Sequence, residues 1–346
     1  MYAGGTQTVP DSYIVVLKNG QTAPELLARY GSRARFTYNG VLPGFAARMT
    51  SLEARRLAAD PRVAYVEQDQ YVRPFGTQLN PPWGLDRIDQ RALPLDHSYT
   101  FPNTGSGATV FILDTGIRFT HVEFGGRAVR GFDAIGDGRN GNDCNGHGTH
   151  VAGVVGGGTF GVAKAVRLVS VRVLDCTGSG SIAGVMAGID WITTHHGARA
   201  IANVSLGGAA STALDDAVRR SINSGVAYAV VAGGSNADAC NQSPARVREA
   251  LTVGASTMAD TRAPFSNFGP CVDLYAPGVG IQSAWNTSDT ATQTISGGSA
   301  STAFASGSAA LYWTRFPAST RAQVVNALIV NATPPLPLLY MGFIPT

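Results

Sequence analysis

The chain has 346 residues, enough for two compact domains, because such domains mostly contain ~100–200 residues. Hydrophobic residues make up 44% of the chain, charged residues only 14%, and glycine occurs 42 times, a balance that predicts a folded protein with many tight turns and argues against disorder. The net charge of +3, without a Lys/Arg-rich run, excludes the electrostatic surface of a nucleic-acid-binding protein. The longest nearly apolar run, 226–234, is far shorter than the ~20 residues that cross a bilayer, so we expect a soluble protein.

The N-terminal part of the chain predicts a small domain. Residues 1–10 lack the basic start and apolar segment of a secretory signal peptide. The following elements, in chain order, are a strand at 12–18, a helix at 23–31, strands at 34–40 and 45–49, a helix at 51–60 and a strand at 63–69. Thr50 and Glu53 have the spacing of a capping box for the second helix. The order βαββαβ predicts a ferredoxin-like α+β domain that ends near Arg73.

From Pro81 onward, predicted strands and helices alternate. The strands lie at 109–114, 168–174, 201–205, 226–233 and 250–256, and the helices begin at His147, Ser181 and Thr212 and near Ser299 and Ser319. Such alternation predicts an α/β domain with a parallel sheet and helices on both of its faces. Functional residues are then expected at the carboxyl ends of the strands.

Three polar residues stand at predicted strand or helix ends. Asp114 ends the strand at 109–114, His147 begins a helix in GHGTHVAG, and Ser299 follows two glycines in SGGSASTAFASG. At the start of a helix, backbone N–H groups stabilise negative charge near Ser299. Each residue alone is a weak signal, because most such residues are structural. Together, the order Asp, His, Ser is that of the subtilisin catalytic triad.

The sequence around these residues resembles the proteinase K branch of the subtilase family. The matching blocks are DTGIRFTHVEF (114–124), DCNGHGTHVAG (143–153), VRVLDCTGSGS (171–181), NVSLGG (203–208), SNADACNQSPA (235–245) and FSNFGPCVDLYAPG (265–278). The resemblance extends from Pro81 to about Thr333, and residues 12–73 resemble the family's inhibitory propeptide. It implies a subtilisin-like α/β fold, with a propeptide domain at 11–75 and a catalytic domain at 76–346.

The resemblance also implies the function of particular residues. It describes a secreted serine endopeptidase, made as a self-inhibited precursor, in which Ser299 is the nucleophile, His147 the general base and Asp114 the group that orients the histidine. The family's two substrate-lining strands correspond to Gly178, Ser179 and Gly180, and to Ser205, Leu206 and Gly207, which should bind an extended peptide as an added strand. The implied partners are protein and peptide substrates and the chain's own propeptide, and we expect a monomer that binds neither nucleic acid nor membrane.

The sequence departs from the family at two places in the expected site. Gly298, Ala300, Ser301, Ala303 and Phe304 replace the usual Thr, Met, Ala, Pro and His around the nucleophile. Gly234 stands where the family has the asparagine that donates to the oxyanion, and Val231 in the same block implies a smaller apolar pocket for the substrate side chain. An alternative function is therefore an impaired subtilase that binds peptides or its prodomain with little turnover.

An unrelated dinucleotide-binding protein is a further alternative. Its only support is GSGSIAG (178–184), which follows a strand but lacks the spacing of the G-x-G-x-x-G turn. We set this alternative aside.

Structural calcium and disulfides are further expectations. Oxygen ligands suited to calcium cluster at Asp86, Asp89, Gln90 and Asp96, and the resemblance adds Ser98. It also places a second calcium at Asp273 with the backbone carbonyls of Arg248 and Ala250, while Asp133 and Asp137 are weaker candidates for a third. The four cysteines allow three pairings or four free thiols. The resemblance selects Cys144 with Cys176 and Cys240 with Cys271, a pattern typical of secreted proteins.

Overall fold

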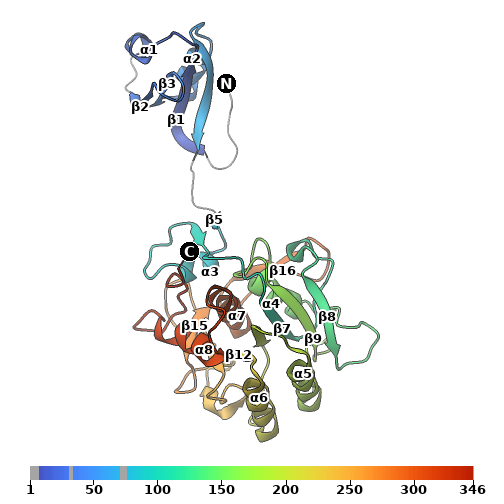
Figure 1. Ribbon diagram of the computed structural model, residues 1–346. Coiled ribbons are helices and arrows are strands. Elements are labelled where there is room, and N and C mark those ends of the chain that lie inside the picture. Colours follow the sequence, from blue (N-terminus) through green and yellow to red (C-terminus); the bar gives the residue numbers. More distant parts are fainter. Residues whose placement is uncertain (1–7, 31–33, 71–75, 346) are drawn as a thin grey trace. The chain divides into compact units, whose positions relative to one another are not determined.

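The computed structural model describes residues 8–30, 34–70 and 76–345 (Figure 1). The chain divides into two compact units, Met1–Phe75 and Gly76–Thr346. Within the described residues, no helix combines the length and the apolar character that crossing a membrane requires.

The N-terminal unit is an antiparallel sheet with two helices. Its elements are β1 (Thr8–Leu17), α1 (Ala23–Tyr30), β2 (Ala34–Tyr38), β3 (Gly44–Arg48), α2 (Ser51–Ala58) and β4 (Val63–Gln70). The strand order β2-β3-β1-β4 is that of the predicted ferredoxin-like arrangement. Both helices pack on a core that contains Leu26, Phe45 and Leu57. The predicted capping box is present, since Thr50 accepts from the Glu53 backbone and Glu53 accepts from the Thr50 backbone.

The C-terminal unit contains a seven-stranded parallel sheet in the order β15-β14-β12-β10-β7-β9-β8. Its strands are β7 (Thr109–Asp114), β8 (Ala128–Asp133), β9 (Arg167–Arg172), β10 (Ala200–Val204), β12 (Ala227–Val231), β14 (Leu251–Ser256) and β15 (Leu274–Pro277). The described helices are α3 (Trp83–Ile88), α4 (His147–Gly156), α5 (Ile182–His195), α6 (Thr212–Ser224), α7 (Gly298–Arg315) and α8 (Arg321–Val330). Two-stranded pairs surround the main sheet: β5 (Thr77–Leu79) with β6 (Ser98–Thr100), β11 (Gly208–Ala209) with β13 (Gln242–Ser243), and β16 (Ile281–Ala284) with β17 (Thr292–Ile295).

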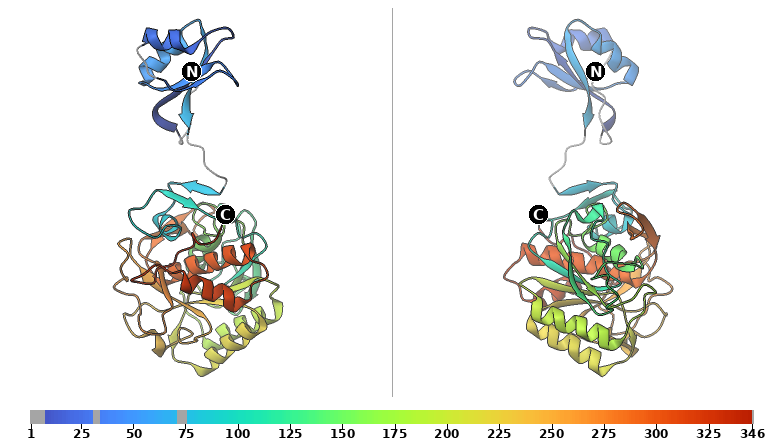
Figure 2. Two further views of the ribbon diagram at one scale, coloured as in Figure 1. Left: turned by 60° about the vertical axis from the view of Figure 1, so that its left-hand side comes forward. Right: turned by 90° about the vertical axis from the view of Figure 1, so that its right-hand side faces the viewer.

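Alternating side chains of the sheet build a core on each face. On β7, Val110 and Ile112 belong to the core that includes side chains of α4, α7 and α8, whereas Phe111 and Leu113 belong to the core with α5 and α6. Figure 2 shows α5 and α6 on one side of the sheet and α7 and α8 on the other. Because helices cover the sheet on both faces, its strands are mainly apolar, and Asp114 stands at the carboxyl end of β7, where functional residues of parallel sheets gather.

Candidate active site

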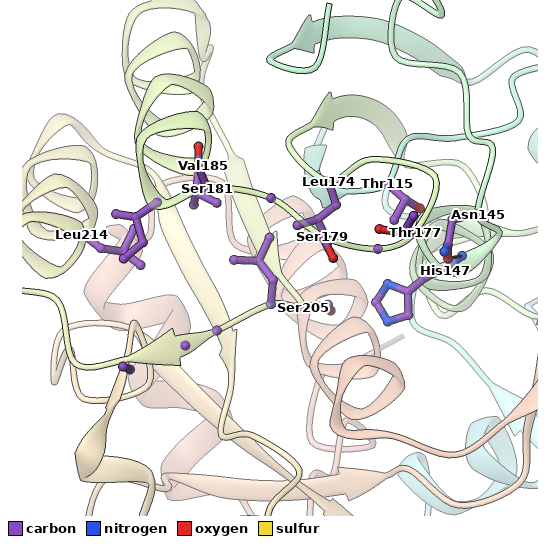
Figure 3. Close-up of a pocket in the computed structure, with 17 residues that line it drawn as sticks. Thr115, Asn145, His147, Leu174, Thr177, Ser179, Ser181, Val185, Ser205 and Leu214 are labelled. Atoms are coloured by element: carbon purple, nitrogen blue, oxygen red, sulfur yellow. Dashed lines mark hydrogen bonds between the residues drawn. The ribbon is translucent and has the colours of Figure 1, made fainter. Parts of the chain in front are cut away.

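Asp114 and His147 form the central contact of the site. Asp114 is the last residue of β7 and is fully buried, and its Oδ1 accepts from Thr115 N at 2.7 Å. The same oxygen lies 2.6 Å from Nδ1 of His147, the first residue of α4. A carboxylate only accepts, so Nδ1 carries the proton in this bond. The His147 side chain remains 28% exposed, at one end of the pocket in Figure 3.

The carboxylate also controls the basicity of the histidine. Burial lowers the pKa of His147, but the charge and hydrogen bond of Asp114, together with the charge of Asp143, outweigh it and raise the pKa above the ordinary 6.5. In contrast, burial lowers the pKa of the neighbouring His150 to about 4. His147 is therefore the histidine of this helix whose pKa lies above its ordinary value.

A buried carboxylate holds the loop that precedes His147. Asp143 Oδ1 accepts from Thr115 Oγ1 at 2.9 Å and from the backbone N–H groups of Asn145 and Gly146, and Asp143 Oδ2 accepts from the N–H and hydroxyl of Thr149. Thr115 Oγ1 in turn accepts from Gly148 N at 2.9 Å. These bonds connect the end of β7 to the first turn of α4, which fixes the separation of Asp114 and His147.

Ser299 is the second residue of α7, where backbone N–H groups lack partners within the helix. Its hydroxyl donates to the carbonyl of Ser205 at 3.3 Å, and the Ser205 hydroxyl donates to the carbonyl of Ser299 at 3.2 Å. Among the described residues no hydrogen bond joins Ser299 to His147, a bond that is often long in enzymes without substrate.

Two segments that the sequence assigned to substrate binding line the same pocket. Gly178, Ser179 and Gly180 lie along it together with Ser205, Leu206 and Gly207, and its volume is about 620 Å³. Figure 3 shows His147 and Asn145 at one end of this pocket and Val185 and Leu214 toward the other. Asp175 holds the first segment in a turn, because its Oδ1 accepts from the N–H groups of Thr177 and Ser179.

Ser299 lines a second cavity, of about 450 Å³, which also includes Gly234. A β-carbon built on Gly234 meets no atom within 4 Å, so this position is open space. Val231 lines the cavity, as the sequence suggested, but so do Gln242 and Phe265, which the sequence analysis did not assign. Both lie in the family-like blocks 235–245 and 265–278, but nothing within those blocks marked either residue as part of the site.

The residues of the first expected calcium site gather around α3 and β6. Asp96 N donates to Asp86 Oδ1 at 3.3 Å and to Gln90 Oε1 at 3.1 Å, and the Asp96 carboxylate accepts from Ser98. Asp89 Oδ1 is buried and has no hydrogen-bond partner among the described residues. Burial, together with the charges of Asp96 and Asp86, raises the pKa of Asp89 to about 7. Clustered carboxylates with an unpartnered oxygen fit a hard divalent cation.

The other two candidate calcium sites differ in whether a protein cation already pairs with their carboxylates. Asp273 accepts from Thr252 N at 2.7 Å, and burial raises its pKa to about 6 although the charge of Arg248 opposes this, so a cation fits here as well. Asp133 and Asp137 both form ion pairs with the buried Arg172, at 3.1 and 2.6 Å. The guanidinium therefore already balances the charge of the third candidate site.

Disulfides join Cys144 to Cys176 and Cys240 to Cys271, with Cα–Cα distances of 5.0 and 5.3 Å, and the described residues contain no free cysteine. The first joins the loop before His147 to the loop that continues into Gly178–Gly180. The second closes the segment that contains Gln242 and Phe265. Both disulfides therefore fasten walls of the two cavities.

Comparisons with known proteins identify relatives of both units. The subtilase family matches residues 105–342, and the peptidase inhibitor I9 family matches residues 12–74. An extracellular serine proteinase of Thermus sp. (strain Rt41A) is 51% identical, over 95% of this chain and 86% of that protein. Alkaline serine exoprotease A of Vibrio alginolyticus is 45% identical, over 96% of this chain and 65% of that protein. The crystal structure of a cold-adapted subtilisin-like serine proteinase has a TM-score of 0.73 and 49% identity, over 76% of this chain and 98% of the other.

Proposed function

The chain belongs to the subtilase family and carries an inhibitor I9 propeptide, and from this premise we propose that Asp114, His147 and Ser299 are the catalytic triad of a serine endopeptidase. The observation that carries the proposal is the 2.6 Å contact between Asp114 Oδ1 and His147 Nδ1. It connects the carboxyl end of a central parallel strand to the start of a helix, beside the cavities into which His147 and Ser299 face.

The geometry supports the following sequence of steps. Asp114 keeps the His147 proton on Nδ1, so that Nε2 is free to take the proton of the Ser299 hydroxyl as Oγ attacks the substrate carbonyl. The oxyanion that forms accepts from the Ser299 backbone N–H at the start of α7. His147 then gives its proton to the leaving amine, which leaves an acyl-enzyme on Ser299. Water, activated by His147, hydrolyses this ester and restores the enzyme.

The substrate would be an extended peptide. Residues 178–180 and 205–207 present backbone groups along one pocket, so a peptide placed between them gains strand-like hydrogen bonds on both sides. The glycines in each segment allow close approach of the substrate backbone. Such binding favours protein and peptide substrates of varied sequence.

Around this site we propose a secreted, monomeric protein with a domain boundary between residues 75 and 76. The similarity to an extracellular serine proteinase of Thermus sp. and the two disulfides support secretion. The resemblance also implies that the tail of the propeptide, which ends at Phe75, inhibits the catalytic unit, and residues 71–75 lie outside the described residues. Calcium would be held by Asp86, Asp89, Gln90, Asp96 and Ser98, and by Asp273 with the carbonyls of Arg248 and Ala250, and would stabilise these loops without taking part in the chemistry.

The proposed triad is tested by following the purified precursor over time. The wild type should release a catalytic unit that begins near Gly76, react with a fluorophosphonate at Ser299 and hydrolyse a chromogenic peptide. Ser299→Ala should do none of these, whereas Ser301→Ala, two residues further along α7, should still react. Labelling of a residue other than Ser299 would contradict the assignment.

The impaired subtilase remains a second candidate, and the open space at Gly234 favours it. It predicts that the fluorophosphonate labels Ser299 but that the chromogenic peptide is not turned over. Turnover by the processed wild type would exclude it.

A further inference from the structure

The cavity beside Ser299 has uncharged walls. Of the described residues that line it, none is Asp, Glu, Lys or Arg, and its longest polar side chain is that of Gln242. The residue whose carbonyl is attacked carries its side chain on the α-carbon next to that carbonyl, so the cavity that contains Ser299 lies within the reach of this side chain. Its lining therefore determines which residue is accepted on the acyl side of the cleaved bond.

The structure defines the position of Gln242 in this cavity. Gln242 pairs with Ala209 between β13 and β11, and Ser243 pairs with Gly208, so its backbone is tied to the segment that continues from Ser205–Gly207. Its Oε1 lies against the α-carbon of Gly233, because a β-carbon at that position would clash with it. Asn267 Nδ2 lies against the same side of Gly233, and the Asn267 amide holds the 232–237 loop by hydrogen bonds.

The Gln242 carboxamide has unused hydrogen-bonding capacity. Among the described residues no hydrogen bond reaches its side chain, whereas two nearby hydroxyls are engaged: Ser205 Oγ donates to Ser299 O, and Ser296 Oγ accepts from Gly280 N. A carboxamide offers two donors and one acceptor oxygen. A second carboxamide can meet it with one hydrogen bond in each direction, whichever way the Gln242 amide is turned.

We infer that Gln242 is a specificity-determining residue that favours glutamine on the acyl side of the cleaved bond. The inference rests on the proposed function and names the substrate class of the same site. A methionine of similar length would fill the cavity but leave the carboxamide of Gln242 unpaired. A glutamate would bring a charge into walls that contain no cation.

The experiment compares two matched peptides that differ only in Gln or Met before the cleaved bond. Gln242→Met removes the donor and acceptor at nearly constant side-chain length. Gln293→Met makes the same change on the exposed strand β17 and serves as the control. The preference, the ratio of kcat/KM for Gln over Met, should fall about three- to tenfold in Gln242→Met, the size of a net neutral hydrogen bond. It should be unchanged in Gln293→Met.

A binding measurement separates this inference from the proposed function. Calorimetric titration of the processed wild type and of both variants with the two product peptides, ending in Gln or Met, reports on the cavity without turnover. The same three- to tenfold loss in the Kd ratio would support the inference even if the processed wild type turned over neither peptide substrate, a result that would contradict only the proposed activity. Equal ratios in wild type and Gln242→Met, by kinetics or by binding, would overturn the inference.

Discussion

Val231 occupies the space that a side chain at position 298 would need. A β-carbon built on Gly298 would lie 2.7 Å from Val231 Cγ2, closer than real side chains approach one another. The valine and the glycine are both departures from the family pattern, and the valine leaves no room for a side chain at position 298.

The family's threonine should therefore fit at position 298 without a loss of stability only when position 231 is changed as well. Gly298→Thr alone forces overpacking, which costs about 1–3 kcal/mol of the free energy of unfolding. In Val231→Ala/Gly298→Thr the clash is gone, and stability should return to within about 1 kcal/mol of Val231→Ala. A double-mutant cycle of denaturant unfolding measures the coupling. Additive effects would contradict the proposed contact.

Gly234→Asn should raise kcat with little change in KM. The open space at this position accepts the side chain, and the added amide would donate to the oxyanion only in the transition state. Removing the corresponding donor from subtilisin, a member of the same family, lowers kcat ~10²–10³-fold, so an increase of at least about tenfold is expected. Gly234→Leu controls for filled space without a donor. An unchanged kcat in folded Gly234→Asn would mean that another group already serves the oxyanion.

The pH dependence of kcat/KM should follow the titration of His147. The group acts as a base only when neutral, and its pKa is raised above 6.5, so activity should rise with pH through a midpoint above 6.5. Asp143→Asn removes one of the negative charges that raise this pKa and should move the midpoint to lower pH. Thr115→Val, which breaks the Asp143–Thr115 hydrogen bond but keeps the Asp143 charge, controls for the loss of that bond. A midpoint that does not move in Asp143→Asn would refute the electrostatic contribution.

Removal of calcium should lower the melting temperature. A site whose ion is present at 100 times its Kd adds ~2.7 kcal/mol to stability, which corresponds to roughly 5–10 °C for a unit of this size. EDTA should produce this shift in the wild type and a smaller one in Asp89→Ala, whose unpartnered oxygen is lost. Asp190→Ala, on the exposed surface of α5, should respond like the wild type. A melting temperature insensitive to EDTA would exclude structural calcium.

The sequence predicted the parts of the fold that have strong local patterns. The strand ending at Asp114 and the helices beginning near His147 and Ser299 were predicted because apolar runs and glycine-rich turns define them. The edge strand β8 was missed, since Arg130 and Gly131 interrupt its apolar pattern. Gly131 is needed there because a β-carbon would clash with Val169 of the neighbouring strand, a constraint that only the packed sheet reveals.

The residues of the candidate site, too, could be predicted only where a local sequence pattern marks them. Roles that rest on motifs, such as those proposed for His147 and Ser299, could be assigned before the structure was seen. The contributions of Gln242 and of the Val231–Gly298 contact depend on residues brought together from separate strands and a helix. No periodicity or motif links these positions, so three-dimensional packing alone reveals them.

The two disulfides also affect how readily a protease is digested by other copies of itself in solution. Proteases cleave segments that can leave the folded surface and extend, so self-digestion begins where local unfolding is cheapest. The loops around the cavities, on either side of His147 and Gln242, would be obvious targets, and Cys144–Cys176 and Cys240–Cys271 restrain them. The crosslinks thus give the enzyme a longer working life at high concentration, a property that bulk melting experiments do not report.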